Sequence, residues 1–262
     1  MTLPEVPPLI VLGMHRSGTS LVARLLSDLG LHMGRRLDIH HEAVAFKNVN
    51  RSLLARVGAH WANPGPFLTA LGDSDFLEEC RRYAIAALAE SVESYGMSEI
   101  SMGWGFKDPR NTLTLPIWRS CFPEAKMLYI YRNGLDVSLS VHRREMRRWV
   151  NRSSEKRMFP PTIAAAYRLW ALYVEAVQIE KKGDHWLSMR YERLLDSPAE
   201  EVARLAGFVG AEPEPQQQRS IIRRLIRRPT RPTRWDSLRL RMLIRAGRLD
   251  LRPLRAMGYH PP

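Results

Sequence analysis

The chain has 262 residues, of which 45% are apolar, and a formal net charge of +13. This length suits one substantial domain, and the apolar content is enough for a full hydrophobic core. No apolar run approaches the roughly 18 to 20 residues that a membrane-spanning helix needs, which argues against an integral membrane protein. The two cysteines lie far apart without a metal-binding motif, so reduced thiols and a cytoplasmic location are expected.

The positive charge comes mainly from arginine, because only six of the 40 basic residues are lysines. The planar guanidinium group suits phosphate and sulfate, so the excess predicts an anionic partner. A phosphorylated cofactor, an acidic acceptor, nucleic acid and a membrane surface all fit this requirement. The chain has no recognised nucleic-acid-binding motif and no interleaved aromatic residues, so no nucleic-acid partner is expected.

The N-terminal region predicts a strand, an anion-binding loop and a helix in direct succession. The apolar run Leu9–Leu12 is followed by a loop that carries Gly13 and Gly18, and a helical leucine pattern then begins. Free N–H groups and the positive dipole at a helix N-terminus hold anions, and glycines allow the backbone to approach closely. Arg16 adds charge, and hydroxyl donors come from Ser17, Thr19 and Ser20.

The loop differs from a nucleotide-hydrolysing P-loop at one position. The spacing of G-x-x-x-x-G-K-[ST] is kept from Gly13 to Gly18, but Thr19 stands where the phosphate-binding lysine belongs. This argues against ordinary ATP or GTP hydrolysis, and a P-loop kinase or NTPase remains the alternative. Dependence on magnesium would distinguish the two classes.

Further along the chain, strands and helices alternate. Strands are predicted within residues 102–110, 125–131 and 185–189, and helices at residues 43–57, 75–95, 112–122, 135–147, 162–181 and 198–208. This alternation predicts an α/β fold, a P-loop-type parallel β-sheet flanked by helices on both faces. Sites in such sheets lie beyond the carboxyl ends of the strands, so the motifs that begin at residues 13, 107 and 132 should converge.

The C-terminal region is predicted to form a separate segment. Residues 1–218 are assigned to the P-loop domain, and residues 219–262 to a basic segment that packs on or near the cofactor site. Thirteen arginines lie between residues 219 and 255, together with Trp235. One interpretation of this arginine-rich tail is a solvated basic helix or coil. The functional interpretation is that it covers an anionic cofactor or binds an acidic partner. Its amphipathicity also allows peripheral contact with an anionic membrane.

Three stretches together resemble a known family. They are the loop from Gly13 to Ser20, the segment Gly105-Phe106-Lys107-Asp108-Pro109-Arg110, and the segment from Tyr131 to Ser140. Their order and content are similar to the bacterial branch of the sulfotransferases that use 3′-phosphoadenosine 5′-phosphosulfate (PAPS). The resemblance extends from about residue 8 to about residue 208. It implies an enzyme that transfers a sulfuryl group from PAPS to an acceptor hydroxyl or amine, releases 3′-phosphoadenosine 5′-phosphate (PAP), and needs no metal.

The resemblance implies two groups of cofactor-binding residues. Arg16, Ser17, Gly18, Thr19 and Ser20 would hold the 5′-phosphosulfate, and His15 would hydrogen-bond the cofactor or the backbone. Arg132 and Ser140 match the pair that grips the 3′-phosphate, although an ion pair between Arg132 and Asp136 is the alternative.

The sequence departs from the family pattern in two places. Gly134 stands where many relatives have proline, a difference expected to matter little. A late glycine-rich basic motif that contacts the 3′-phosphate in many animal relatives is absent, and its substitutes are guessed to be Arg228, Arg231 or Arg234.

The implied reaction is an in-line transfer with a general base. Lys107 resembles the family lysine that contacts the transferring group, while pairing with Asp108 is the alternative; Arg16 is the second cationic candidate. Glu42 is the preferred base, unless it only favours a helix N-terminus, and His41 and His40 are neighbouring candidates. The histidine base of animal cytosolic relatives is excluded, because Pro109 occupies its position.

The acceptor is open: a small molecule, glycan, lipid or peptide, with an acidic group favoured by nearby arginines. Its pocket is expected from residues 35–75 and 145–165, near Trp149 and the arginines at positions 143, 144, 147 and 148. Those arginines are equally compatible with a solvated face. A non-enzymatic polyanion-binding protein is the third interpretation, and the sequence does not specify the oligomeric state.

Overall fold

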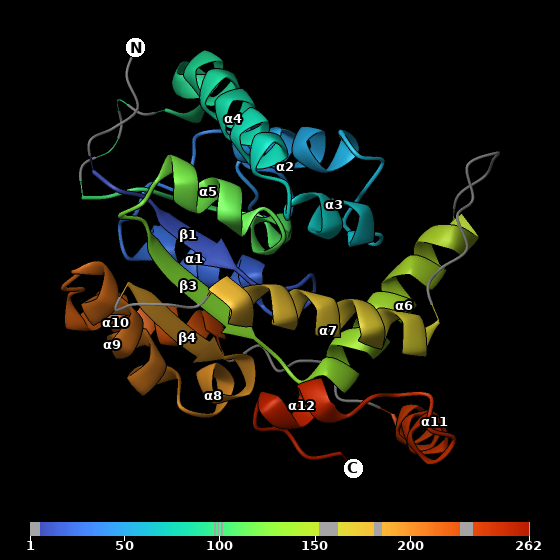
Figure 1. Cartoon of the computed structure of the whole chain (residues 1–262). Helices are drawn as coiled ribbons and strands as arrows, with labels where there is room; N and C mark the ends of the chain where they lie inside the picture. Colours follow the sequence, from blue (N-terminus) through green and yellow to red (C-terminus); the bar gives the residue numbers. More distant parts are fainter. Residues whose placement is uncertain are drawn as a thin grey trace.

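The computed structural model describes residues 6–96, 98, 100, 102–151, 162–180, 185–225 and 233–261. Its centre is a four-stranded sheet in the order β2-β1-β3-β4, and all neighbouring strands are parallel. The strands are β1 (Leu9–Leu12), β2 (Gly105–Lys107), β3 (Lys126–Tyr131) and β4 (Trp186–Arg190). Helices cover both faces of the sheet (Figure 1), so the predicted α/β fold is confirmed.

The central strand β1 is buried on both faces. Ile10 and Leu12 contribute to the core on one side, whereas Leu9 and Val11 contribute to the core on the other side. All four residues are at most 3% exposed. A strand covered on both faces has no polar side, which explains why its sequence is a continuous apolar run and does not alternate.

The helices divide into two layers. One face of the sheet is covered by α1 (Thr19–Asp28), α9 (Pro198–Val209) and α10 (Pro215–Leu225), and the other by α2 (Val44–Ala55), α4 (Ser74–Tyr95), α5 (Leu115–Cys121), α6 (Gly134–Asn151) and α7 (Ile163–Glu180). Short elements connect them: α3 (Gly65–Ala70), the 3₁₀ helix η2 (Pro109–Thr112) and α8 (Tyr191–Asp196). Within the described residues, no helix has both the length and the apolar character needed to span a bilayer.

A buried contact between α2 and β2 positions the segments that carry Glu42 and Lys107. Phe46 stacks on Phe106 with ring centroids 3.8 Å apart. Next to it, the fully buried Asn50 donates to Asn111 Oδ1 (2.7 Å) and accepts from Trp118 Nε1 (2.9 Å). Because a buried amide is costly unless its hydrogen bonds are made, this network fixes α2 against the turn after β2.

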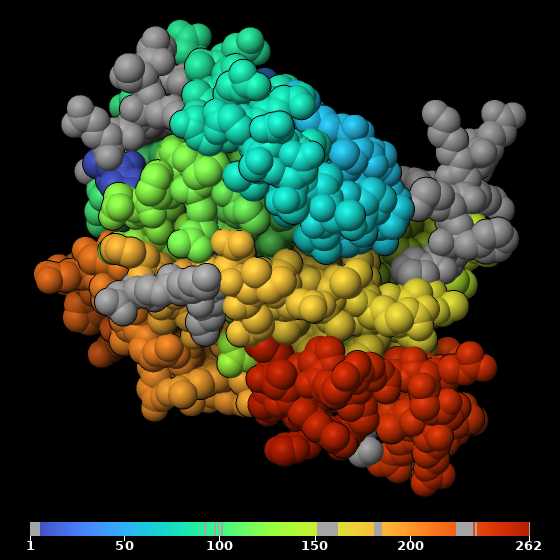
Figure 2. All heavy atoms as spheres, viewed as in Figure 1, coloured from blue at the N-terminus to red at the C-terminus, as the bar shows by residue number. Residues whose placement is uncertain are grey.

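The C-terminal segment is partly built into the core. Residue 218 lies inside α10, where Ile221 is fully buried against the layer that contains α1 and α9. The helices α11 (Arg234–Arg245) and α12 (Arg252–Ala256) follow, and Leu240, Leu254 and Tyr259 join the opposite core. The space-filling view shows this end of the chain as a lobe along one edge of the molecule (Figure 2). The division into two segments stays a prediction.

Gly134 is a packing position, contrary to the expectation that its identity matters little. A Cβ atom at Gly134 would lie 2.5 Å from Cε3 of the buried Trp170, whereas a Cβ at Gly207 in α9 would have no neighbour within 4 Å. We expect Gly134→Ala to lower the free energy of unfolding by about 1–3 kcal/mol through overpacking. Gly207→Ala should be neutral or raise it by up to about 1 kcal/mol through helix propensity. Urea unfolding measures both, and equal effects would contradict the packing argument.

Candidate active site

The loop between β1 and α1 requires glycine at both ends. Gly13 has a φ of 141°, and a Cβ there would lie 2.3 Å from the Ile130 carbonyl oxygen. Gly18 has a φ of 103°, and its Cβ would lie 2.5 Å from Cδ2 of Tyr191. Both values of φ lie where L side chains are strained. The loop start is held by Thr112, whose Oγ1 accepts a hydrogen bond from the Gly13 N–H at 2.9 Å.

Three hydroxyl side chains lie around the N-terminus of α1. Ser17 and Thr19 are buried, and Ser20 Oγ donates to the His40 carbonyl at 2.8 Å. Gly18 is the N-cap in a left-handed conformation without a side-chain cap, and its carbonyl accepts hydrogen bonds from the Leu21 and Val22 N–H groups. The N–H groups of Thr19 and Ser20 at the very start of the helix have no acceptor within it. This arrangement suits a phosphate or a phosphosulfate.

The loop meets the start of α6 in a small arginine-lined cleft. Arg16 Nε donates to Ser140 Oγ at 2.9 Å, which joins two residues that are 124 positions apart in the sequence. The cleft has a volume of about 70 Å³, and its charged lining comprises one carboxylate and four guanidinium groups: Asp136, Arg16, Arg132, Arg143 and Arg147. Burial lowers the pKa of Arg16, and the neighbouring Arg132 lowers it further. The cleft therefore has an excess of positive charge that an anion would neutralise.

Arg132 has incomplete hydrogen bonding in this cleft. Its guanidinium group lies over the Tyr191 ring at 4.7 Å, and Nη2 contacts Asp136 Oδ2 at 3.5 Å, so the ion pair considered from the sequence is present. Arg132 Nε is buried without a hydrogen-bond partner among the described residues. By contrast, Ser138 Oγ donates to the Gly134 carbonyl inside its own helix. Of the two nearby serines, only Ser140 thus reaches the loop residue Arg16.

Lys107 and Glu42 form a buried pair beside the loop. Lys107 Nζ lies 3.3 Å from Glu42 Oε1, donates to the His40 carbonyl at 2.6 Å, and lies 3.4 Å from Ser20 Oγ. Glu42 Oε2 contacts Arg110 Nη2 at 3.3 Å. The alternative pairing of Lys107 with Asp108 is not what the structure shows, because Asp108 accepts from the Arg110 backbone N–H and from Arg110 Nε, at 2.8 Å each.

Burial shifts the acid–base properties of this pair. It raises the pKa of Glu42 above that of an ordinary carboxyl group, and the neighbouring Asp108 adds to this effect. Burial also lowers the pKa of Lys107, although Glu42 opposes the shift. A carboxylate with a raised pKa accepts protons more readily than an ordinary one, which is a property that a general base needs.

The three histidines near the loop differ in their surroundings. His15 packs edge-to-face against Trp61 with ring centroids 4.7 Å apart, and its Nε2 is buried without a hydrogen-bond partner in the described part of the chain. Burial and the nearby Arg144 hold the pKa of His15 well below its ordinary value. His40 contributes its backbone carbonyl to the Lys107 contact. His41 adopts a left-handed φ of 57°, and burial and Arg24 lower its pKa.

Among its described residues, the C-terminal segment reaches the arginine-lined cleft through α11. Asp236 in α11 accepts a hydrogen bond from Arg143, which lines the cleft. Of the residues guessed to touch a 3′-phosphate, Arg228 and Arg231 lie outside the described residues, as does the side chain of Arg234.

A second pocket adjoins the Glu42 site. It has a volume of about 350 Å³ and contains both apolar and basic side chains: Arg51, Leu54, Ala55, Ala59, His60, Trp61 and Arg110. Two residues that line it contact residues of the candidate site. Trp61 packs against His15, and Arg110 donates to Glu42. It overlaps the expected acceptor region, 35–75, in its residues 51–61.

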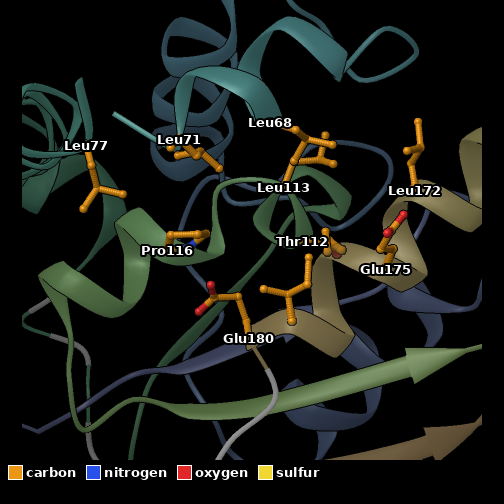
Figure 3. Close-up of a pocket in the computed structure, with 12 residues that line it drawn as sticks. Leu68, Leu71, Leu77, Thr112, Leu113, Pro116, Leu172, Glu175 and Glu180 are labelled. Atoms are coloured by element: carbon orange, nitrogen blue, oxygen red, sulfur yellow. The ribbon is translucent and has the colours of Figure 1, made fainter. Parts of the chain in front are cut away.

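A third pocket lies apart from the Lys107–Glu42 pair and from the arginine-lined cleft. It has a volume of about 600 Å³ and lies between α3, α4, α5 and α7. Figure 3 shows Leu68, Leu71, Leu77 and Leu113 around it, with Glu175 and Glu180 at its lower side. Mainly apolar walls with two carboxylates do not suit an anionic cofactor. Among the described residues, no group of three or more His, Cys, Asp or Glu side chains is placed to hold a metal ion.

Four contributors to the site were not predicted from the sequence: Thr112, Tyr191, Trp61 and the His40 carbonyl. Thr112 anchors Gly13, Tyr191 packs between Gly18 and Arg132, and Trp61 lies between His15 and Arg144, whose guanidinium group is 5.0 Å from the Trp61 ring. Tyr191 could have been predicted from the sequence. An aromatic residue directly after a strand lies at the carboxyl edge of the sheet, where the other motifs meet.

Comparison with known proteins identifies the family of this chain. A model of the sulfotransferase family matches residues 7–215. The nodulation protein NoeE of Sinorhizobium fredii is 28% identical over 232 residues, which are 79% of this chain and 51% of that protein. The chain thus spans about half the length of this curated relative.

Solved structures share the fold. Sulfotransferase STF9 from Mycobacterium avium has a TM-score of 0.55 and 16% identity, with coverage of 87% of this chain and 70% of that one. The sulfotransferase domain of the Synechococcus PCC 7002 olefin synthase has a TM-score of 0.54 and 15% identity, with coverage of 100% and 99%. At these identities the two structures support the architecture alone. Because the family model covers most of the chain, this protein belongs to the sulfotransferase family.

Proposed function

We propose that this chain transfers a sulfuryl group from PAPS to a hydroxyl or amine group of an acceptor. The observation that carries the proposal is the placement of the buried Lys107–Glu42 pair beside an anion-binding loop. Lys107 Nζ lies 3.3 Å from the Glu42 carboxylate and 3.4 Å from Ser20 Oγ at the start of α1. A cation and a base therefore adjoin the place where a phosphosulfate would lie.

The residues present fit a cofactor with two separate anionic ends. The loop residues Ser17 to Ser20 and the N-terminus of α1 would hold the 5′-phosphosulfate. Arg132 and Ser140 would hold the 3′-phosphate, beside the loop residue Arg16 that contacts Ser140. The Arg132 Nε, which has no hydrogen-bond partner among the described residues, is available to donate to that phosphate. PAPS supplies an activated sulfuryl group, and the chain's own residues supply its orientation and charge neutralisation.

The roles of the reacting side chains follow from their surroundings. Glu42 would accept the proton from the acceptor hydroxyl, as its raised pKa suits a base. Lys107 would neutralise charge that develops on the oxygen between phosphorus and sulfur. The positive charge of Arg16 would stabilise the anionic oxygens of the 5′-phosphosulfate. His41, whose pKa is lowered, is the second candidate for the general base.

The pocket beside Arg110 is proposed as the acceptor site. It adjoins Glu42 on the side away from Lys107, and its basic lining of Arg51, His60 and Arg110 favours an acceptor that carries a carboxylate or sulfate group. Trp61 provides an aromatic surface of the kind that packs against a sugar ring or an apolar group. Free thiols at Cys80 and Cys121 are consistent with work in a reducing compartment.

Isothermal titration with PAP, in the absence of magnesium and beside ATP, tests the cofactor class. We expect micromolar PAP binding that is at least about 10-fold tighter than ATP binding, because the cleft places an arginine cluster for a 3′-phosphate that ATP lacks. Magnesium-dependent ATP binding without a preference for PAP would contradict the proposal and favour a kinase.

A second experiment tests the acceptor, and offers radiolabelled PAPS together with uronic-acid or neutral oligosaccharides. Preferential labelling of the neutral sugars would contradict the acidic-acceptor assignment alone.

A further inference from the structure

The outer face of α11 carries exposed apolar side chains that the body of the protein does not cover. Trp235 is 75% exposed, Leu238 is 47% exposed and Met242 is 55% exposed. Their spacing of three and four residues places them within an arc of about 60° on the helix surface. The opposite side of α11 packs on the core through Leu240, so this helix is attached by one face and leaves an apolar stripe outside.

Arginines border this stripe on both sides. At about 100° per residue, Arg239 projects beside one edge of the stripe, and Arg241 and Arg245 project beside the other. All three are exposed, and none makes an ion pair with another described residue. The acidic residue of the helix, Asp236, points inward, where it caps the helix together with Thr233 and binds Arg143. The outer face therefore combines unneutralised positive charge with apolar side chains.

We propose that α11 is a docking surface for an anionic lipid bilayer. A helix that lies in a membrane interface has an apolar stripe for the acyl boundary and flanking arginines for the headgroups, and tryptophan favours this depth. The charges of the two surfaces are complementary, since the three arginines face anionic headgroups without competing carboxylates. The C-terminal region that contains α11 forms a lobe at one edge of the molecule (Figure 2). An acidic protein partner is a different proposal and is an outcome of the test.

Docking through α11 would leave the arginine-lined cleft on the inner side of that helix. Asp236, which points inward, connects α11 to Arg143, and Arg143 lines the cleft that also contains Arg132. The docking itself does not depend on the sulfuryl-transfer proposal, because it rests on residues outside that site.

Co-sedimentation of the full chain with vesicles tests the proposal. Binding to vesicles with 30% phosphatidylserine should exceed binding to pure phosphatidylcholine at least about 10-fold at moderate salt and should decrease as salt rises. Replacing Trp235, Leu238 and Met242 together with serine should lower the partition coefficient at least about 10-fold. Arg241→Glu should lower it about 10-fold, since it removes one attractive charge and adds a repulsive one.

Two control variants test whether vesicle binding is specific to α11 or arises from nonspecific adsorption or unfolding. Ile179→Ser removes an apolar side chain that is 65% exposed on α7, and Arg82→Glu makes the same charge change on α4; both should retain binding. Urea unfolding reports folding, and the α11 variants should unfold at the same urea concentration as the wild-type chain. Absence of vesicle binding by the wild-type chain, or equal losses in the controls, would overturn the proposal. Capture of polyglutamate without capture of vesicles would assign the face to an acidic protein and would also overturn it.

Discussion

Replacing Arg132 with alanine is expected to weaken PAP binding at least about 100-fold. The guanidinium group lies in the cleft with Arg16 and Ser140, and its Nε has no partner in the described structure. Loss of a charge-assisted contact to a phosphate of this kind costs about 2–5 kcal/mol, and each 1.4 kcal/mol is a tenfold change in affinity. Isothermal titration of the variant with PAP measures the loss.

A comparison of ligands assigns the effect to the 3′-phosphate. Adenosine 5′-phosphosulfate lacks this group, so its affinity should change by less than about threefold in Arg132→Ala. Two serines form a matched pair: Ser140→Ala should weaken PAP binding about 10-fold, while Ser138→Ala should not, because Ser138 Oγ is already bonded to the Gly134 carbonyl. Equal losses for both ligands would show that Arg132 holds the loop through its contact with the Arg16 carbonyl and does not bind the phosphate.

Replacing Glu42 with glutamine is expected to reduce turnover of PAPS about 10²- to 10⁴-fold with PAP affinity little changed. The substitution keeps the shape of the side chain but removes its ability to accept a proton, and general-base catalysis contributes about this factor. The assay follows PAP release from PAPS with the best acceptor of the screen, or with water as the acceptor. Glu79→Gln on α4 is the control, because Glu79 is paired with Arg56 away from the site.

The pH dependence provides a second test of the same role. Only the deprotonated carboxylate accepts a proton, so the rate should rise as pH increases through the pKa of Glu42. Burial raises that pKa, and the rising limb should therefore lie at higher pH than for an ordinary carboxyl group. Because the pKa of Lys107 is lowered, loss of its charge should bring the rate down on the alkaline side. If Glu42→Gln keeps the rising limb while His41→Asn loses it, the base is His41.

The local sequence determined the parts of the site that lie within one continuous stretch. The two glycines, the hydroxyl residues and the leucine pattern after Leu12 predict a strand, an anion loop and a helix, because backbone conformation and helical periodicity are properties of neighbouring residues. Alternation of such units also predicts a parallel sheet, and parallel strands bring their carboxyl ends to one edge. The fold and the convergence of the motifs at residues 13, 107 and 132 were predictable for this reason.

Tertiary structure alone decided which partners these side chains find. Asp108 is the sequence neighbour of Lys107, yet Lys107 pairs with Glu42, which is 65 residues away, and Asp108 pairs with Arg110. Likewise, Thr112 anchors Gly13 from 99 residues away, and Trp170 leaves no room for a side chain at Gly134. Ion pairing and close packing depend on the distances between segments that the sheet brings together, and no local pattern encodes those distances. The pocket beside Arg110 has the same origin, since its walls come from α2, η2 and the turn at Trp61.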